Sequence, residues 1–249
     1  MKAAKKHGAD ASVLLLAAAT LILLLPAAVR AQTDCDLDKT LRMFEEAYAP
    51  VRDYTCLLSK KEWIDGEYVV WNNVTYKFRK PDCYYMKWTE GENFGREIIY
   101  AGKKYGYKLE VHLGGMLNVM NFSLDPKGSI ALRSSRHPIM ESDFGFILRM
   151  IQQNVRKAQK EKSAVIDCLG EAEIDGRKVR HYRAEFPKKK GFINHIINIS
   201  VDDETNLPIR IEMLDWNDRL VESYTFSDLK INTGLKDADF DTKNEAYGY

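Results

Sequence analysis

The chain has 249 residues, of which 45% are hydrophobic and 29% are charged, and this composition excludes intrinsically disordered and fibrous proteins. Its 37 basic and 36 acidic residues are interleaved along the sequence. Nucleic acid is therefore not expected as a partner, because binding it requires a basic footprint that replaces counterions on phosphates.

The first 31 residues have the anatomy of a secretory signal peptide. Three lysines precede an apolar run at 12–25, which Pro26 closes before a small-residue ending at 29–31. The run is shorter than the ~20 residues that a bilayer span needs, and no cysteine directly follows the ending, which argues against a membrane or lipid anchor. We expect a signal peptide over 1–31, a single domain over 32–249, and a periplasmic or secreted location. Cleavage removes four basic residues and one acidic residue, which leaves 33 basic and 35 acidic residues and a formal net charge of −2.

An amphipathic helix is predicted over residues 36–48, where apolar residues recur at spacings of four, three and four. Asp36 is its expected N-cap, and Pro50 ends it. The period then changes to two, and Asp65-Gly66 is typical of a hairpin turn. We expect a five-stranded antiparallel meander with strands at 54–63, 67–79, 83–88, 96–101 and 105–113.

The middle of the chain is apolar and rich in methionine at 114–125, and a long helix is predicted over 142–159 with Ser142 as its N-cap. From Ser163 the period returns to two, with a second hairpin signal at Asp175-Gly176, and strands are predicted as far as Lys230. Strands before and after helices, without regular βαβ alternation, predict an antiparallel α+β fold. The expected covers of the apolar face of its curved sheet are the two helices and the segment 114–125.

A sheet too large for two helices to cover leaves an apolar hollow, and such hollows bind apolar ligands. The residues expected to line it are Tyr68, Val70, Tyr76, Met86, Trp88, Tyr100, Leu109, Val111, Leu113, Met116, Met120, Phe144 and Ile147. The alternative is that these side chains simply fill a solid core, which is the commoner fate of apolar stripes. Large aromatic groups and soft methionines suit a lipid or acyl chain.

Two stretches resemble the LolA-like superfamily. "ISVDDETNLPIRIEM" and "YTFSDLKINTGLKDADF" are similar to the C-terminal half of its members, with an Asp-x-x-Thr-x-Leu-Pro hairpin and a final Asp-x-x-Phe. "YTCLLSKKEWIDGEYVVWNNVTYKFRKPDCYYMKW" and "IIYAG" resemble a domain-of-unknown-function group of bacterial exported proteins within it. The resemblance, over about 36–241, implies an unclosed β-barrel with helices as a lid over an apolar cavity.

Members of the superfamily carry lipid-like cargo, such as lipoprotein acyl chains, across the periplasm, or sense it in an envelope-stress regulator. The resemblance therefore implies a periplasmic protein that binds a lipid. The alternative is an envelope sensor or interaction module with a protein partner. A sensor would expose the apolar segment around Met116, Met120 and Phe122 for docking, and a carrier would bury it.

Neither catalysis, metal binding nor a cofactor is expected. The best catalytic cluster is "RSSRHPIMESD", in which Ser135, His137, Glu141 and Asp143 are close in sequence, and it leaves a hydrolase as the weaker alternative. The other interpretation is a loop that leads into a helix start, with Ser142 and Asp143 at the helix N-terminus.

Four cysteines, Cys35, Cys56, Cys83 and Cys168, would remain after cleavage. In an exported protein they permit two disulfides with three possible connectivities, or free buried thiols, and their spacing does not match a zinc site. We expect at least one bridge.

Overall fold

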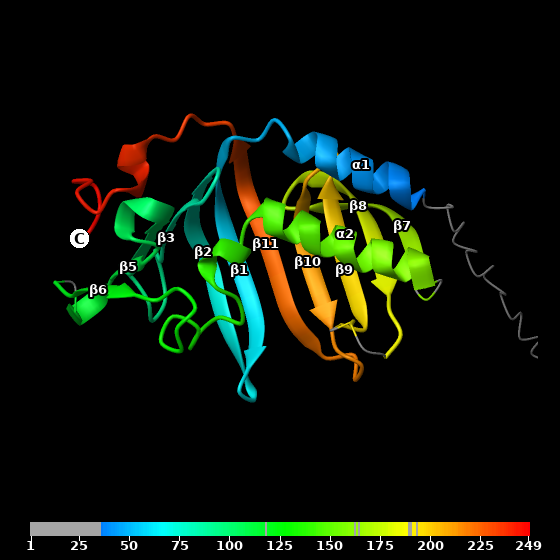
Figure 1. Cartoon of the computed structure of the whole chain (residues 1–249), viewed down its shortest axis with the longest axis horizontal. Helices are drawn as coiled ribbons and strands as arrows, with labels where there is room; N and C mark the ends of the chain where they lie inside the picture. Colours follow the sequence, from blue (N-terminus) through cyan, green and yellow to red (C-terminus); the bar gives the residue numbers. More distant parts are fainter. Residues whose placement is uncertain (1–35, 118, 162, 164, 189–190, 193) are drawn as a thin grey trace, which may run out of the picture. The chain divides into compact units, whose positions relative to one another are not determined.

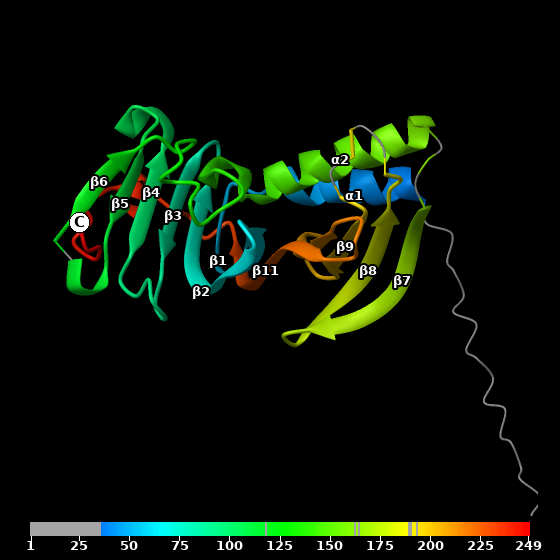
Figure 2. The same cartoon turned by 90° about the horizontal axis from the view of Figure 1, so that it is seen from below.

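The computed structural model describes residues 36–249 except 118, 162, 164, 189–190 and 193. The predicted signal peptide and Cys35 lie outside these residues. Within them, one open antiparallel sheet carries two α-helices on one of its faces (Figures 1 and 2).

Eleven strands form this sheet in the order β6-β5-β4-β3-β2-β1-β11-β10-β9-β8-β7. Their bounds are β1 Asp53–Ile64, β2 Glu67–Arg79, β3 Cys83–Lys87, β4 Glu97–Ala101, β5 Leu109–His112, β6 Asn121–Leu124, β7 Val165–Ile174, β8 Arg177–Glu185, β9 Ile196–Asp202, β10 Pro208–Leu214 and β11 Leu220–Ile231. Two meanders, β1–β6 and β7–β11, are joined by the pairing of β1 with β11. The end strands β6 and β7 do not pair with each other, so the barrel is unclosed, as predicted.

Both predicted hairpin turns are present because their residues adopt the left-handed backbone that a tight turn needs. Asp65 and Gly66 have φ of 48° and 95°, and Asp175 and Gly176 have φ of 50° and 75°. The five predicted strands of the first meander are confirmed as β1–β5, although the last is shorter than predicted. A short 3-10 helix at Gly102–Tyr105 and a positive φ at Tyr107 delay the start of β5 to Leu109.

The helices α1 (Leu37–Tyr48) and α2 (Phe144–Glu161) lie on the same side of the sheet, over the β7–β11 half (Figure 2). Asp36 caps α1, accepting from the backbone N–H of Lys39 at 2.9 Å. Phe144 of α2 packs on Tyr54 and Phe226, with ring centroids 4.8 Å and 4.6 Å apart. No helix of the described part is long and apolar enough to cross a membrane.

The predicted N-cap of α2 is wrong by one residue. Asp143, not Ser142, accepts from the backbone N–H groups of Gly145 at 2.6 Å and Phe146 at 3.2 Å. The Ser142 hydroxyl instead donates to the carbonyl oxygen of Ile139. The Asp143 carboxylate also accepts from the buried hydroxyl of Tyr84 at 2.9 Å, which fixes the helix start against the sheet.

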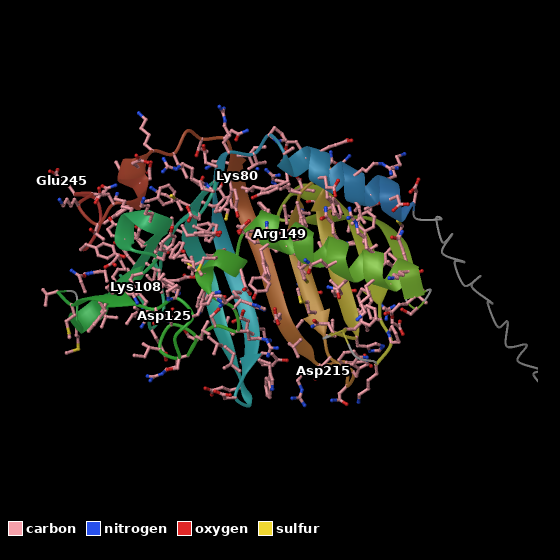
Figure 3. The ribbon with its side chains drawn as sticks, viewed as in Figure 1. Lys80, Lys108, Asp125, Arg149, Asp215 and Glu245 are labelled. Carbon is pink, nitrogen blue, oxygen red and sulfur yellow. The ribbon has the colours of Figure 1, made fainter. Side chains whose placement is uncertain are left out.

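The segment 114–125 does not cover the sheet. It contains a short 3-10 helix, Gly115–Leu117, and then β6, which continues the sheet as its edge strand. The cover over the β1–β5 half comes instead from residues 125–143, here called the crossover segment, which runs from the end of β6 to the start of α2. Asp125, at its beginning, is labelled in Figure 3.

A second, smaller cluster lies on the opposite face of β3 and β4. Cys83, Tyr85, Ile99 and Ala101 alternate with the residues that face the main core, and they bury Phe240 of the C-terminal segment. Tyr247 stacks on Tyr85 with ring centroids 4.3 Å apart. The C-terminal residues therefore cover the face of β3 and β4 that is opposite the main core.

The prediction of at least one disulfide is confirmed, because Cys168 is disulfide-bonded. Cys56 and Cys83 are free and buried thiols. Burial raises the pKa of the Cys56 thiol well above its usual range, so this group stays protonated and unreactive in the folded protein.

Candidate functional site

A pocket of about 690 Å³ lies between strands β2, β4, β5 and β6 and the crossover segment. Its apolar lining comprises Tyr68, Val69, Val70, Trp71, Ile98, Leu109, Val111, Leu113, Phe122, Leu124, Ile130 and Ala131. Its polar lining comprises Glu67, Glu92, Asn93, Arg96, Arg133 and Ser134. An apolar pocket with a few polar groups is the usual form of a site for a small hydrophobic ligand.

Strand register builds the apolar wall. Ile98 lies opposite Val111, and Val111 lies opposite Phe122, so these three side chains form a row across β4, β5 and β6. Leu109 and Leu124 form the next pair on the same face. The period of two along each strand therefore produces a continuous apolar surface.

The crossover segment supplies the opposite side. Ile130 remains 63% exposed although it borders the pocket, and Ala131 is half-buried beside it. The segment is therefore a wall of the pocket as well as a cover of the sheet.

A β-bulge changes where two predicted site residues lie. The register of β1 with β2 shifts between Leu58 and Lys60, opposite Asn73, whose φ is 47°. One extra residue reverses the alternation of faces, so Trp71 is buried on the same side as Val74. Tyr68 and Val70, which are predicted to line the hollow together with Tyr76, are 38% and 50% exposed and border only the edge of the pocket.

The other predicted residues divide into three groups. Leu109, Val111 and Leu113 line the pocket, as does the edge formed by Tyr68 and Val70. Buried side chains of the main core are Tyr76, Met86, Trp88, Tyr100, Phe144 and Ile147, of which Met86 and Ile147 also border much smaller cavities. Met116 and Met120 are exposed and line none of these pockets. Whether the pocket residues bind a ligand stays a prediction.

Sequence reasoning missed several residues that line the pocket. Ile98, Ile130 and Ala131 were not singled out, nor were Arg96 and Arg133. A signal for Ile98 was its place two residues before Tyr100, because alternate residues of a strand share one face. Residues 130–133 gave no periodic signal, since the crossover segment is irregular.

A network of buried charges ties the crossover segment to β1 and β11. Glu62 is fully buried, and its carboxylate pairs with Lys60 at 2.9 Å, accepts from the Arg136 backbone N–H at 3.0 Å and accepts from the Tyr224 hydroxyl. Lys60 also donates to the hydroxyl of Ser135 at 2.9 Å. Burial lowers the pKa of Lys60 to about 8, although Glu62 and Glu222 favour its charged form.

Glu222 forms the second anchor of this network. Its buried carboxylate accepts from Arg136 Nε at 2.8 Å and contacts His137 Nε2 at 3.0 Å, while His137 Nδ1 lies 3.0 Å from Glu141. Burial alone lowers the pKa of His137, but the hydrogen bonds and charges of Glu222 and Glu141 outweigh it and raise the pKa above 6.5. Burial alone would raise the pKa of Glu222. The hydrogen bonds and positive charges of His137 and Arg136 outweigh this effect and lower the pKa below 4.5.

The geometry of this network is that of a tether. The Ser135 hydroxyl donates to the carbonyl oxygen of His137 at 2.8 Å and makes no hydrogen bond to its imidazole, whose two nitrogens face carboxylates. A serine nucleophile needs a base aimed at its hydroxyl, and the imidazole is not so placed. In the described part, no group of three or more His, Cys, Asp or Glu side chains is placed to hold a metal ion.

Solved structures that are similar to this chain share little sequence identity with it. No curated protein matches the sequence. Similar solved structures include the lipoprotein LppX from Mycobacterium tuberculosis, with 13% identity over 82% of this chain and 97% of that one and a TM-score of 0.47. A LolA superfamily protein from Nitrosomonas europaea shows 12% identity over 82% of this chain and 96% of that one, with a TM-score of 0.33. MucB shows 12% identity over 84% of this chain but 63% of its own length, with a TM-score of 0.47.

The unclosed eleven-stranded antiparallel sheet with two helices on one face confirms the α+β architecture predicted from the sequence. The family model described as "Protein of unknown function (DUF1571)" matches residues 51–249, which is most of the chain. The chain therefore belongs to this family.

Proposed function

We propose that this protein is exported and binds a lipid or another hydrophobic ligand in the pocket beneath the crossover segment. The observation that carries the proposal is the pocket of about 690 Å³, whose walls are mostly aliphatic and aromatic. This volume lies within the range of roughly 300–1,000 Å³ that is usual for sites of small ligands. The proposed role is binding and not catalysis, because the polar groups around the pocket form no arrangement of nucleophile and base.

An alkyl chain suits these walls energetically. Transfer of a methylene group from water into an apolar environment is favourable by about 0.8 kcal/mol, so roughly ten methylenes would contribute about 8 kcal/mol before the costs of ordering the chain and the protein. A small polar ligand would gain much less from the row formed by Ile98, Val111 and Phe122. A lipid or acyl chain is therefore the expected ligand class.

Titration of the purified protein with a fluorescent fatty acid tests this proposal. Ile130→Glu places a carboxylate at the rim, where the side chain is already 63% exposed, so the fold should tolerate it. We expect at least a tenfold loss of affinity for the fatty acid, because a charged group beside an alkyl chain must lose its hydration. Val165→Glu is the matched control, since Val165 is 57% exposed on β7 and does not line the pocket. Equal binding by the wild type and both variants would contradict the proposed site.

Export is tested separately. The proposed signal peptide and mature domain require the protein from the native host to begin near Gln32 and to fractionate with the periplasm or the medium. N-terminal sequencing of that material would reveal an intact Met1 if the leader is retained. This outcome would remove the export part of the proposal without affecting the pocket.

A second candidate function, a protein-binding module of the envelope, is favoured by one observation. Met116, Met120 and Phe122 are 102%, 40% and 41% exposed, and Val119 beside them is 89% exposed. Phe122 belongs to β6, and Met116, Val119 and Met120 precede it. Among the described residues β6 is the edge strand of the sheet, and an edge strand can pair with another chain. Affinity purification from the envelope tests this role: a stoichiometric partner that is lost with Met116→Glu would support it, and repeated purification without a partner would count against it.

A further inference from the structure

Arg96 is a half-buried cation at the wall of the apolar pocket. In the described part of the chain, its guanidinium has neither an ion-pair partner nor a side-chain hydrogen bond, unlike the other buried charges of this half of the sheet. Lys60 and Lys87, for example, each pair with a buried glutamate, at 2.9 Å and 2.8 Å. Burial lowers the pKa of Arg96, and no carboxylate offsets that effect.

The local structure holds Arg96 in place. Its backbone N–H donates to the carbonyl oxygen of Asn93 at 2.9 Å, and its carbonyl oxygen accepts from the Trp88 N–H at 3.0 Å, just before β4 begins. The guanidinium lies 6.0 Å from the ring centroid of Trp88, which in turn packs edge-on against Trp71 of the pocket wall. The backbone position of Arg96 is therefore fixed, and the planar fork of a guanidinium loses little conformational entropy for each hydrogen bond that it forms with an anion.

The other charges at the pocket do not neutralise Arg96. Glu67 and Glu92 also border the pocket, but both are exposed and form no ion pair with it among the described residues. Exposed carboxylates remain hydrated and need no counter-ion, whereas a partly desolvated guanidinium gains from one. Arg133, on the crossover segment, adds a second cation on the opposite side of the same pocket.

We propose that the pocket binds an amphiphile with an anionic headgroup, a carboxylate or a phosphate, which pairs with Arg96 while the alkyl chain lies along the apolar wall. This inference rests on the proposed function and adds the chemistry of the headgroup. Guanidinium matches both headgroups because its planar N–H groups can donate two parallel hydrogen bonds to either.

Calorimetric titration of the delipidated protein with matched probes tests the headgroup. The probes are myristate, myristyl alcohol and myristoyl lysophosphatidate, each below its micellar concentration, at a pH where the fatty acid is ionised. A charge-assisted hydrogen bond contributes roughly 1.5–3 kcal/mol, so both acids should bind the wild type about 10- to 100-fold more tightly than the alcohol. Inorganic phosphate alone should not compete with the acids for the pocket. Full competition would show a simple anion site and would overturn the proposal of an amphiphilic ligand.

Three variants locate the effect. Arg96→Met should weaken binding of the acids at least tenfold and leave the alcohol unchanged, and Arg96→Lys should give an intermediate result. Arg149→Met is the control, because Arg149 is an exposed arginine on α2 and does not line the pocket (Figure 3). If Arg96→Met does not fold, the salt dependence of binding by the wild type provides the test. Added salt should weaken the binding of the acids and leave the binding of the alcohol unchanged.

The outcomes separate this inference from the proposed function. The proposal of an anionic headgroup would be overturned if the wild type bound acid and alcohol equally well, or if Arg96→Met left the binding of the acids unchanged. Either result would leave the proposed apolar site intact. Failure of all three amphiphiles to bind would overturn the apolar site itself, and the headgroup with it.

Discussion

Replacing Glu222 by Gln should release the crossover segment from the sheet. The Glu222 carboxylate is 4% exposed and bonds both Arg136 and His137, the residues that carry the segment across β11. Glutamine keeps the shape of the side chain but has no charge. The negative charge that favours the guanidinium of Arg136 and the protonated form of His137 therefore disappears.

The expected cost is about 2–3 kcal/mol in the free energy of unfolding. Breaking a fully buried ion pair costs about 3–5 kcal/mol. We discount that range because the Arg136 side chain is 40% exposed and the His137 side chain 28% exposed, so both regain some hydration. Part of the loss will appear as local opening, since the segment is irregular and the sheet beneath it is continuous.

Urea unfolding and amide hydrogen exchange measure the two effects. Exchange should accelerate at the Arg136 amide, which donates to Glu62 in the closed segment, and stay unchanged in β9 and β10. Glu212→Gln is the matched control, because Glu212 pairs with Arg210 at 2.7 Å with side chains 29% and 43% exposed, and such surface pairs contribute about 0–1 kcal/mol. Equal unfolding free energies for the two variants, with no faster exchange at Arg136, would refute the tether.

Three further results are expected. The difference in unfolding free energy between the wild type and His137→Gln should be greatest between pH 4.5 and 6.5. This difference should fall as pH rises through the raised pKa of His137, and also as pH falls through the lowered pKa of its partner Glu222. A difference that does not change with pH would contradict the pairing. Asp143→Ala should cost about 2–4 kcal/mol by chemical denaturation, because it removes a helix cap and the short hydrogen bond of the buried Tyr84 hydroxyl; a loss typical of a surface residue would be inconsistent with that role. Cys56 and Cys83 should resist a thiol reagent in the native protein and react after unfolding, so rapid native labelling would disprove their burial.

Local signals in the sequence sufficed for most of the sheet and for the first helix. Asp36 had the residue type and position of a cap, and the Asp-Gly pairs had the conformation that hairpins need, so these predictions depended on neighbouring residues alone. The α+β class also followed, because the change from period two to a helical period and back is visible in the sequence.

Features that depend on pairing between distant residues could not be predicted in the same way. The bulge at Asn73 shifts the face of Tyr68 and Val70, yet strict alternation in the sequence gives no sign of it. Glu62 and Glu222 are far apart in sequence and exposed residues by type, and their burial follows only from the pairing of β1 with β11. Arg96 was overlooked for the same reason, since its place at the pocket depends on the fold around it.

Photo-crosslinking with a diazirine fatty acid, followed by peptide mapping, tests the proposed ligand site most directly. The proposed site predicts labelling of the peptides that contain Leu109–Leu113 and Phe122–Ala131, with loss of this labelling in Ile130→Glu and competition by unlabelled fatty acid. Labelling confined to β8–β10, or the absence of saturable labelling, would contradict a hydrophobic ligand site beneath the crossover segment.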